Sequence, residues 1–307
     1  MNFISLADWP RLRIEEMLRF AAAIKKFPEQ HRHALDGRVL LMMFQKPSLR
    51  TRVSFETAMV RLGGHAIAYD LSQSPWGHGR ETPADTALTA SRYVDGIMAR
   101  LFSHEDMKSL AAHATIPVIN GLTDLEHPCQ ALGDLMTLQE SFGKFEGIRL
   151  AYVGDGNNNV THSLLDACSK VGIHLTVGCP PGKEFEPVPS ILERARGFAS
   201  ESGAHLAVVH DARAAVAGAH AVYTDTWMSY HIPAERRTER ERALVPFRVT
   251  TALMREARPD AVFMHCLPAW RGKELDADVI DGPHSIVFAQ AENRLHTEKA
   301  ILLTLIR

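Results

Sequence analysis

The stretch KPSLRTRVSFE (46–56) gathers hydroxyl and guanidinium groups directly after the apolar run RVLLMMF and directly before a helix-like segment. A turn from a strand into a helix leaves backbone N–H groups of the first helical turn without intrahelical partners, so such a turn can bind an anion. Ser48 and Thr51 add hydroxyl donors, and Arg50 and Arg52 add planar donor forks that suit phosphate oxygens. An N-capped helix with two surface arginines explains the same residues equally well, so spacing alone leaves both interpretations open.

The tetrapeptide HPCQ places His127 and Gln130 three residues apart, on one face of a helix. Together the two side chains could hold a carbonyl or an amide group. A plain helix start, with Pro128 in the first turn, also explains the tetrapeptide and is favoured when HPCQ is taken in isolation.

Three more polar segments follow strand-like runs in the second half of the chain. Cys266, in MHCLPAWRG, comes at a strand end, where open α/β sheets bind ligands; its thiol is a nucleophile, a group that binds an electrophile, or most simply a small buried side chain. The turn GDGNNNVTHS (154–163) lacks the GxGxxG spacing of dinucleotide sites, and its asparagine amides suit a small zwitterion better. Asp225 and Ser229, in TDTWMSY, could hold an ammonium group or cap a helix.

Alternating strand-like and helix-like runs must position these groups. RVLLMMF, DGIMAR and IPVIN read as strands separated by helical patterns, and HPCQALGDLMTLQESFG predicts a long helix that ends at Gly143. The alternation then restarts at IRLAYVGDG, which indicates parallel sheets and a domain boundary near 137–147. We predict an α/β fold of two doubly wound domains with mostly parallel sheets, joined by bridging helices. The first domain covers 1–140, with the C-terminal helix 290–307 packed back on it, and the second covers 141–289.

Composition limits the classes of function. The 307 residues are 46% apolar and 23% charged, with a net charge of −2, which is typical of a globular protein and gives no basic field for nucleic acid or anionic membrane. Four scattered cysteines predict neither a disulfide framework nor a structural zinc site, and no targeting or membrane-spanning pattern is evident, so we expect a cytoplasmic protein. The charged run ERRTERER (235–242) is most simply a solvated helix face, or part of a mobile lid.

The order of these motifs is more specific than any one of them. S-x-R-T-R, R-x-F, VINGLTD, HPCQ, GDGNN, D-x-W-x-S, HCLP and AENR follow one another along nearly the whole chain, from FISLADW to AENRLHTEKAILLTL. This succession resembles the ornithine carbamoyltransferase family, within the larger group that includes aspartate carbamoyltransferase. The resemblance implies transfer of the carbamoyl group from carbamoyl phosphate to the δ-amine of L-ornithine, giving L-citrulline and phosphate. It also implies a role in arginine metabolism, a homotrimer with shared active sites, and no cofactor or metal.

The resemblance assigns carbamoyl phosphate to the first domain and the amino acid to the second. Its carbamoyl phosphate-binding residues fall on Ser48, Leu49, Arg50, Thr51, Trp76, Arg100, His127, Gln130, Cys266, Leu267 and Arg294. Its amino-acid-binding residues fall on Asn158, Asn159, Asp225, Ser229 and Tyr230, with one asparagine of the first two in contact with ornithine. Its catalytic residues fall on Arg50, Arg100, His127, Asp225 and Cys266. Cations and N–H donors around the carbonyl and the phosphate would stabilise the oxyanion and the leaving group.

Two departures from the family pattern keep an alternative acceptor open. Tyr230 and His231 replace the usual methionine and glycine beside the amino-acid site, and Trp76 falls where many ornithine enzymes carry a glutamine. Related transferases that use acylated ornithines place a tryptophan in that region. The alternative is therefore a carbamoyltransferase that acts on a modified ornithine or another diamino acid. A non-catalytic binding protein should have lost residues such as Arg50 or Cys266, and both are present.

Overall fold

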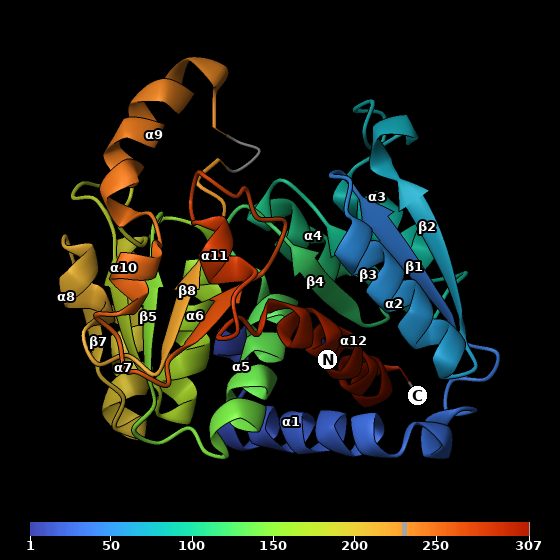
Figure 1. Cartoon of the computed structure of the whole chain (residues 1–307). Helices are drawn as coiled ribbons and strands as arrows, with labels where there is room; N and C mark the ends of the chain where they lie inside the picture. The colour runs from blue at the N-terminus through green and yellow to red at the C-terminus, as the bar shows by residue number, and fades with distance from the viewer. Residues whose placement is uncertain (229–231, 307) are drawn as a thin grey trace. The chain divides into compact units, whose positions relative to one another are not determined.

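The computed structural model describes residues 1–228 and 232–306, and the chain divides into two compact units. Unit 1 comprises Met1–Met136 and Glu292–Arg307, and unit 2 comprises Thr137–Ala291. Each unit holds one sheet in which every pairing between the described strands is parallel (Figure 1). The prediction of two doubly wound α/β domains is confirmed.

Unit 1 has a four-stranded sheet in the order β2-β1-β3-β4, so the strand order reverses between β1 and β3. Its strands are β1 (Val39–Phe44), β2 (His65–Asp70), β3 (Gly96–Arg100) and β4 (Val118–Leu122). Its helices are η1 (Leu6–Asp8), α1 (Arg11–Lys26), η2 (Pro28–His31), α2 (Leu49–Arg61), η3 (Leu71–Gln73), α3 (Pro83–Ala90) and α4 (His104–His113), followed by α5 (Pro128–Phe142), which continues into unit 2.

Unit 2 has a five-stranded sheet in the order β7-β6-β5-β8-β9, which reverses between β5 and β8. Its strands are β5 (Arg149–Val153), β6 (His174–Gly178), β7 (Leu206–Val209), β8 (Ala221–Thr224) and β9 (Val262–His265). Its helices are α6 (Asn159–Val171), α7 (Pro189–Ser202), α8 (Ala212–Val216), η4 (Ala234–Arg236), α9 (Arg237–Leu244), η5 (Val245–Phe247), α10 (Thr251–Met254) and α11 (Ala277–Ile280). Helix α12 (Val287–Leu305) begins here and ends in unit 1.

Local chemistry explains where the two helices next to the strand reversals begin. Ser48 caps α2 by accepting a hydrogen bond from the Thr51 N–H at 3.2 Å. Asn158 caps α6 by accepting from the N–H groups of Val160 and Thr161, both at 2.9 Å. Gly172 ends α6 in the left-handed conformation that glycine adopts most readily. The sequence thus fixes the turns that follow β1 and β5.

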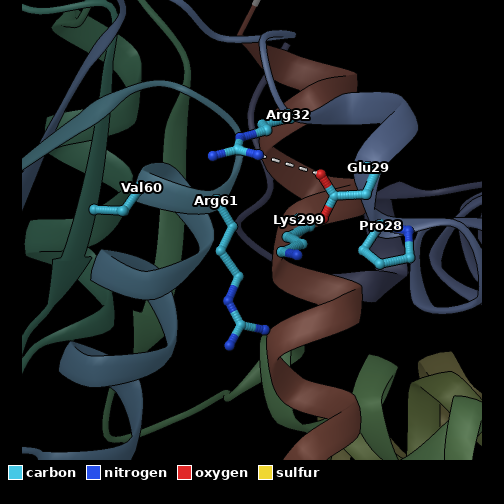
Figure 2. A pocket seen from close by; sticks show the side chains of 6 residues that line it. All are labelled: Pro28, Glu29, Arg32, Val60, Arg61 and Lys299. Atoms are coloured by element: carbon cyan, nitrogen blue, oxygen red, sulfur yellow. Dashed lines mark hydrogen bonds and ion pairs between the residues drawn. The ribbon is translucent and has the colours of Figure 1, made fainter.

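The C-terminal helix α12 supplies a buried row of side chains to unit 1, including Arg294 and Lys299. Near its C-terminal end, Lys299 lines a pocket of about 410 Å³ with residues of η2 and of the end of α2 (Figure 2). No helix among the described residues is both long and apolar enough to cross a membrane. All four cysteines lie in the described part of the chain and are free thiols.

Two glycines of unit 2 offer a test of the packing. A Cβ on Gly178, at the end of β6, would lie 2.6 Å from the Cβ of Ala215 in α8, whereas a Cβ on Gly197 in α7 would meet nothing within 4 Å. We expect Gly178→Ala to destabilise the protein by about 1–3 kcal/mol through overpacking. The control Gly197→Ala should stabilise it by about 1 kcal/mol, because alanine favours a helix interior. Urea unfolding of both variants checks this, and equal effects would contradict the packing of α8 on β6.

Candidate active site

The predicted anion-binding residues of unit 1 lie where its strand order reverses. Arg100 is the last residue of β3, and its register partner is Phe44, the last residue of β1. The loop after β1 leads directly to the cap at Ser48. Ligands of doubly wound folds bind outside the carboxyl ends of the strands at such a reversal. The topology therefore brings Arg100 and the start of α2 to the edge where a ligand is expected.

The start of α2 is a capped helix, as one of the two interpretations predicted. The Ser48 cap satisfies one N–H group, and a helix has four such groups at its first turn, so capping alone does not exclude an anion. Leu49 is 72% exposed, Arg50 is half-buried and Thr51 is buried. Arg52 is exposed, and its guanidinium pairs with Glu56 at 3.0 Å.

Arg294 joins three segments that are far apart in the sequence. Its Nη1 donates to Gln130 Oε1 at 2.8 Å, and its Nη2 reaches Thr51 Oγ1 at 3.5 Å. Its charge is balanced by Glu298, whose Oε1 accepts from Nη2 at 2.6 Å and from Nε at 3.0 Å. Gly133 allows this approach, because a Cβ there would lie 3.1 Å from Arg294 Cδ. The structure thus brings together Thr51, Gln130 and Arg294.

His127 is buried among four cationic side chains, which we call the cation cluster: Lys46, Arg50, Arg100 and Arg294. Burial lowers the pKa of His127 well below its usual value, and the charges of all four cations lower it further, that of Arg294 most. The imidazole is therefore neutral at physiological pH. A neutral imidazole can donate a hydrogen bond without adding a further positive charge to the cluster.

Lys46 is a residue of this cluster that the sequence analysis did not single out. It is 4% exposed, and its Nζ lies 4.7 Å from the centroid of the Phe102 ring. Burial, aided by the charge of Arg100, lowers the pKa of Lys46 to about 8. A lysine in a loop after a strand is normally exposed, so the sequence held no local signal of its burial beyond its position at the head of KPSLRTRVSFE.

Trp76 is not among the polar groups that the structure gathers in unit 1. Its side chain is 9% exposed and belongs to an apolar cluster that also contains Met43, Leu71, Ala87 and Leu101. Packing within its own unit therefore accounts for a tryptophan at this position.

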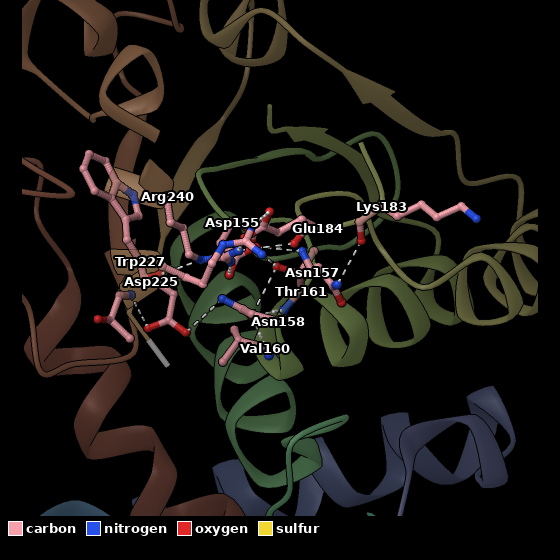
Figure 3. A network of polar contacts seen from close by, with 12 residues as sticks. Asp155, Asn157, Asn158, Val160, Thr161, Lys183, Glu184, Asp225, Trp227 and Arg240 are labelled. Carbon is pink, nitrogen blue, oxygen red and sulfur yellow. Dashed lines mark hydrogen bonds and ion pairs between the residues drawn. The ribbon is translucent and has the colours of Figure 1, made fainter. Parts of the chain in front are cut away.

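In unit 2, three predicted residues, Asn158, Asp225 and Cys266, form one polar network at the reversal between β5 and β8. Figure 3 shows the contact between Asn158 and Asp225. Asp225 Oδ1 accepts from the Cys266 thiol at 2.9 Å, and Asp225 Oδ2 accepts from Asn158 Nδ2 at 3.3 Å. Asn158 Nδ2 also donates to the Tyr152 hydroxyl at 2.8 Å. The carboxylate of Asp225 is thus held in place by an amide and a thiol.

Other predicted residues of unit 2 flank this network. Asn159 is the first residue of α6 and is half-buried. Leu267 has a φ of 57°, a left-handed conformation that is unusual for a side chain with a Cβ, and its N–H donates to His265 Nδ1 at 2.8 Å. Ser229 and Tyr230 lie outside the described residues.

Asp225, His265 and Cys266 also have metal-ligand atoms within 4.8 Å of one another. Each of them already takes part in a hydrogen bond: Cys266 donates to Asp225, and His265 Nδ1 accepts from Leu267. These contacts give the three side chains a structural role that does not require a metal.

Arg240 is a second residue that the sequence did not single out. It belongs to the charged run 235–242, which was expected to be a solvated helix face. Its neighbours in α9 are mostly exposed, but Arg240 is 2% exposed (Figure 3). It forms a buried ion pair with Asp155, which lies in the turn after β5. It also donates hydrogen bonds to Glu184 Oε1 at 3.2 Å and to the Trp227 carbonyl at 3.3 Å. Its guanidinium also lies 4.7 Å from the Phe185 ring centroid.

This ion pair ties α9 to the turn that carries Asn158. Burial raises the pKa of Asp155 to about 7, while Arg240 acts against that rise. Arg240 thus anchors α9 to Asp155 and to the Trp227 carbonyl in the same unit.

Two doubly wound α/β units, each with polar groups at its strand reversal, define a two-domain α/β enzyme. Residues 1–140 match the family model described as "Aspartate/ornithine carbamoyltransferase, carbamoyl-P binding domain", and residues 146–305 match "Aspartate/ornithine carbamoyltransferase, Asp/Orn binding domain". The chain belongs to the aspartate/ornithine carbamoyltransferase family.

Individual relatives agree with this assignment. The ornithine carbamoyltransferase of Anoxybacillus flavithermus is 48% identical, over 99% of this chain and 96% of its own length. The anabolic ornithine carbamoyltransferase of Pyrococcus furiosus is 48% identical, over 98% of this chain and 95% of its own. The solved structure of an ornithine carbamoyltransferase from Pyrococcus furiosus superposes with a TM-score of 0.94 at 46% identity, covering 100% of this chain and 96% of that one.

The Arg240–Asp155 pair predicts a large effect on stability. Arg240→Met should destabilise unit 2 by about 3–5 kcal/mol, because it leaves the Asp155 carboxylate buried without a counter-charge. The control Arg242→Met removes an exposed arginine of the same helix and should change the free energy of unfolding by less than about 0.5 kcal/mol.

Urea unfolding at pH 8 measures both variants. Adding Asp155→Asn to Arg240→Met should recover part of the loss, since it removes the uncompensated charge. Equal stabilities of Arg240→Met and Arg242→Met would contradict the buried pair.

Proposed function

We propose that this protein transfers the carbamoyl group of carbamoyl phosphate to the δ-amine of L-ornithine, forming L-citrulline and phosphate. The observation that carries the proposal is the cation cluster around the neutral His127, in the unit that matches the carbamoyl-P binding domain. Such a cluster suits a substrate that carries a phosphate dianion next to a carbonyl. The relatives named ornithine carbamoyltransferase support ornithine as the acceptor.

In the proposed donor site, the phosphate is held by the first turn of α2. Its contacts are the backbone of Ser48, Leu49 and Thr51 and the guanidinium of Arg50, with Arg100 completing the cradle. Arg100 and His127 polarise the carbamoyl carbonyl, and Gln130, fixed by Arg294, holds the carbamoyl group. Trp76 supports this site from within its apolar cluster, which also includes Leu101 next to Arg100.

In the proposed acceptor site, Asp225 orients the amine of ornithine. Its carboxylate is held by Cys266 and Asn158, so it keeps one position during the reaction. Because Asn158 is engaged in capping α6 and in holding Asp225, we assign the contact with the amino acid to Asn159. Leu267 lines the reacting centre beside Cys266, and Ser229 and Tyr230 complete the amino-acid site.

The chemistry requires no covalent enzyme intermediate. The neutral δ-amine attacks the carbamoyl carbon, and the resulting oxyanion is stabilised by Arg100 and His127. The bond from carbon to the phosphate oxygen then breaks, and the departing phosphate accepts the proton lost by the amine. The cation cluster stabilises the charge that develops on that phosphate.

The alternative acceptor, a modified ornithine or another diamino acid, has less support. Packing in unit 1 explains Trp76, so this residue no longer argues for an acylated substrate. The alternative acceptor now rests on Tyr230 and His231, which depart from the family pattern.

We also propose that the protein is a cytoplasmic homotrimer that acts in arginine biosynthesis. The family resemblance supports the trimer, and the four free thiols suit a reducing compartment. The anabolic relative from Pyrococcus furiosus supports the biosynthetic direction.

The acceptor is tested by incubating the protein and carbamoyl phosphate with L-ornithine, Nα-acetyl-L-ornithine, L-lysine and putrescine separately. Mass spectrometry of the ureido products and initial rates give kcat/KM for each amine. We expect L-citrulline from L-ornithine with the highest kcat/KM. No turnover of ornithine at millimolar concentration, with a product from another amine, would overturn the proposal.

The proposed donor site predicts a large kinetic effect at Arg50. Arg50→Ala should lower kcat/KM for carbamoyl phosphate by about 10²–10³-fold, the loss expected for one transition-state donor. The matched control is Arg52→Ala, whose exposed ion pair with Glu56 is worth about 1 kcal/mol or less. Steady-state rates compare the two variants, and similar kinetics would contradict the role of Arg50.

Lys46 predicts a dependence on alkaline pH. Its pKa of about 8 means that its charge is lost as the pH rises through that value, while the neighbouring arginines stay charged. With ornithine saturating, we expect kcat/KM for carbamoyl phosphate to fall above that pH. Lys46→Arg should move this fall to higher pH, and an unchanged profile in the variant would contradict a charge contribution from Lys46.

A further inference from the structure

A pocket in unit 1 is lined by none of the residues proposed for catalysis or substrate binding. It measures about 410 Å³, which is within the range of small-molecule sites, and lies where η2, the end of α2 and α12 come together (Figure 2). Its lining residues are Pro28, Glu29, Arg32, Val60, Arg61 and Lys299.

Lys299 is the unusual member of this group. It is 1% exposed, yet within the described part of the chain its ammonium group has no hydrogen bond and no ion pair. Burial lowers the pKa of Lys299 and the charge of Arg61 lowers it further, while the charge of Glu29 acts in the opposite direction without reversing the shift. Arg294 on the same helix is also buried, but Glu298 balances its charge. A buried cation without an ion-pair partner destabilises the fold, so stability alone does not explain a lysine at this position.

The pocket carries an excess of positive charge. Arg32, Arg61 and Lys299 are cationic and Glu29 is the one acid in the lining, so the lining has a formal net charge of +2. Glu29 pairs with Arg32 at 3.5 Å, and both side chains are largely exposed, so this pair is weak and leaves Arg32 able to turn to a ligand. Arg61, the last residue of α2, presents an exposed guanidinium.

We propose that this pocket is a second anion site, which binds a small phosphate dianion as a free ion or as the head of a small phosphate monoester. Lys299 supplies a charge at the buried wall, and Arg61 and Arg32 supply guanidinium forks whose geometry matches phosphate oxygens. The bound dianion would give Lys299 an ion-pair partner, in addition to the longer-range influence of Glu29.

The test must separate this site from the proposed donor site, which also binds phosphate. Inorganic phosphate is titrated calorimetrically into the purified full-length protein while a phosphonate analogue of carbamoyl phosphate saturates the donor site. Chloride keeps the ionic strength constant. We expect one phosphate to bind per chain. Lys299→Met and Arg61→Gln should each weaken this binding by about tenfold or more, the effect of losing one charged hydrogen bond.

Lys108→Met, which removes an exposed lysine of α4 in the same unit, is the matched control and should leave phosphate binding unchanged. Without phosphate, Lys299→Met should melt at or above the temperature of the unmodified protein, because it removes an unpaired buried charge. If that variant folds poorly, the exposed Arg61→Gln carries the binding test. No phosphate binding with the donor site filled, or binding that neither variant weakens, would overturn the proposal.

Discussion

The repulsion among four cations that surround one buried imidazole is the constraint on which the proposed chemistry depends. Lys46, Arg50, Arg100 and Arg294 all lower the pKa of His127, so the cluster cannot also hold a charged histidine. Glu298 balances the charge of Arg294, and the charge of Asp124 acts on Lys46. The strand reversal and the cap of α2 position Arg100 and Arg50, and Arg294 is held by Gln130 and Glu298. The fold of unit 1 thus builds in this repulsion, which the proposed phosphate dianion would relieve.

The corresponding site of unit 2 is built around a carboxylate, Asp225, instead of a group of cations. In the proposed acceptor site, the amine would need a carboxylate that stays in place, and Asp225 is held by an amide and a thiol that bring no positive charge. The turn that supplies the amide is fixed in turn by the pair between Asp155 and Arg240. Both units therefore have a strand reversal followed by a capped helix. Cationic side chains lie there in unit 1, and a carboxylate lies there in unit 2.

The sequence predicted the alternating elements well because short apolar strands and capped helices are local patterns. It did not predict α1, whose buried face mixes with many charged residues, or the short helices α10 and α11. It also took Arg240 for a solvated residue, since its burial depends on Asp155, 85 positions earlier. The contact of Arg294 with Thr51 spans 243 positions, so only the family resemblance pointed to it.

The protonation state of His127 tests this account most directly. Selective ¹⁵N labelling of histidine, with the His127 signals identified by their loss in a His127→Gln variant, allows its imidazole to be followed by NMR as the pH is lowered. The cation cluster predicts that His127 is still neutral at the usual histidine pKa of about 6.5 and takes up a proton only well below it. A titration at or above that usual value would contradict the arrangement of charge on which the proposed mechanism depends.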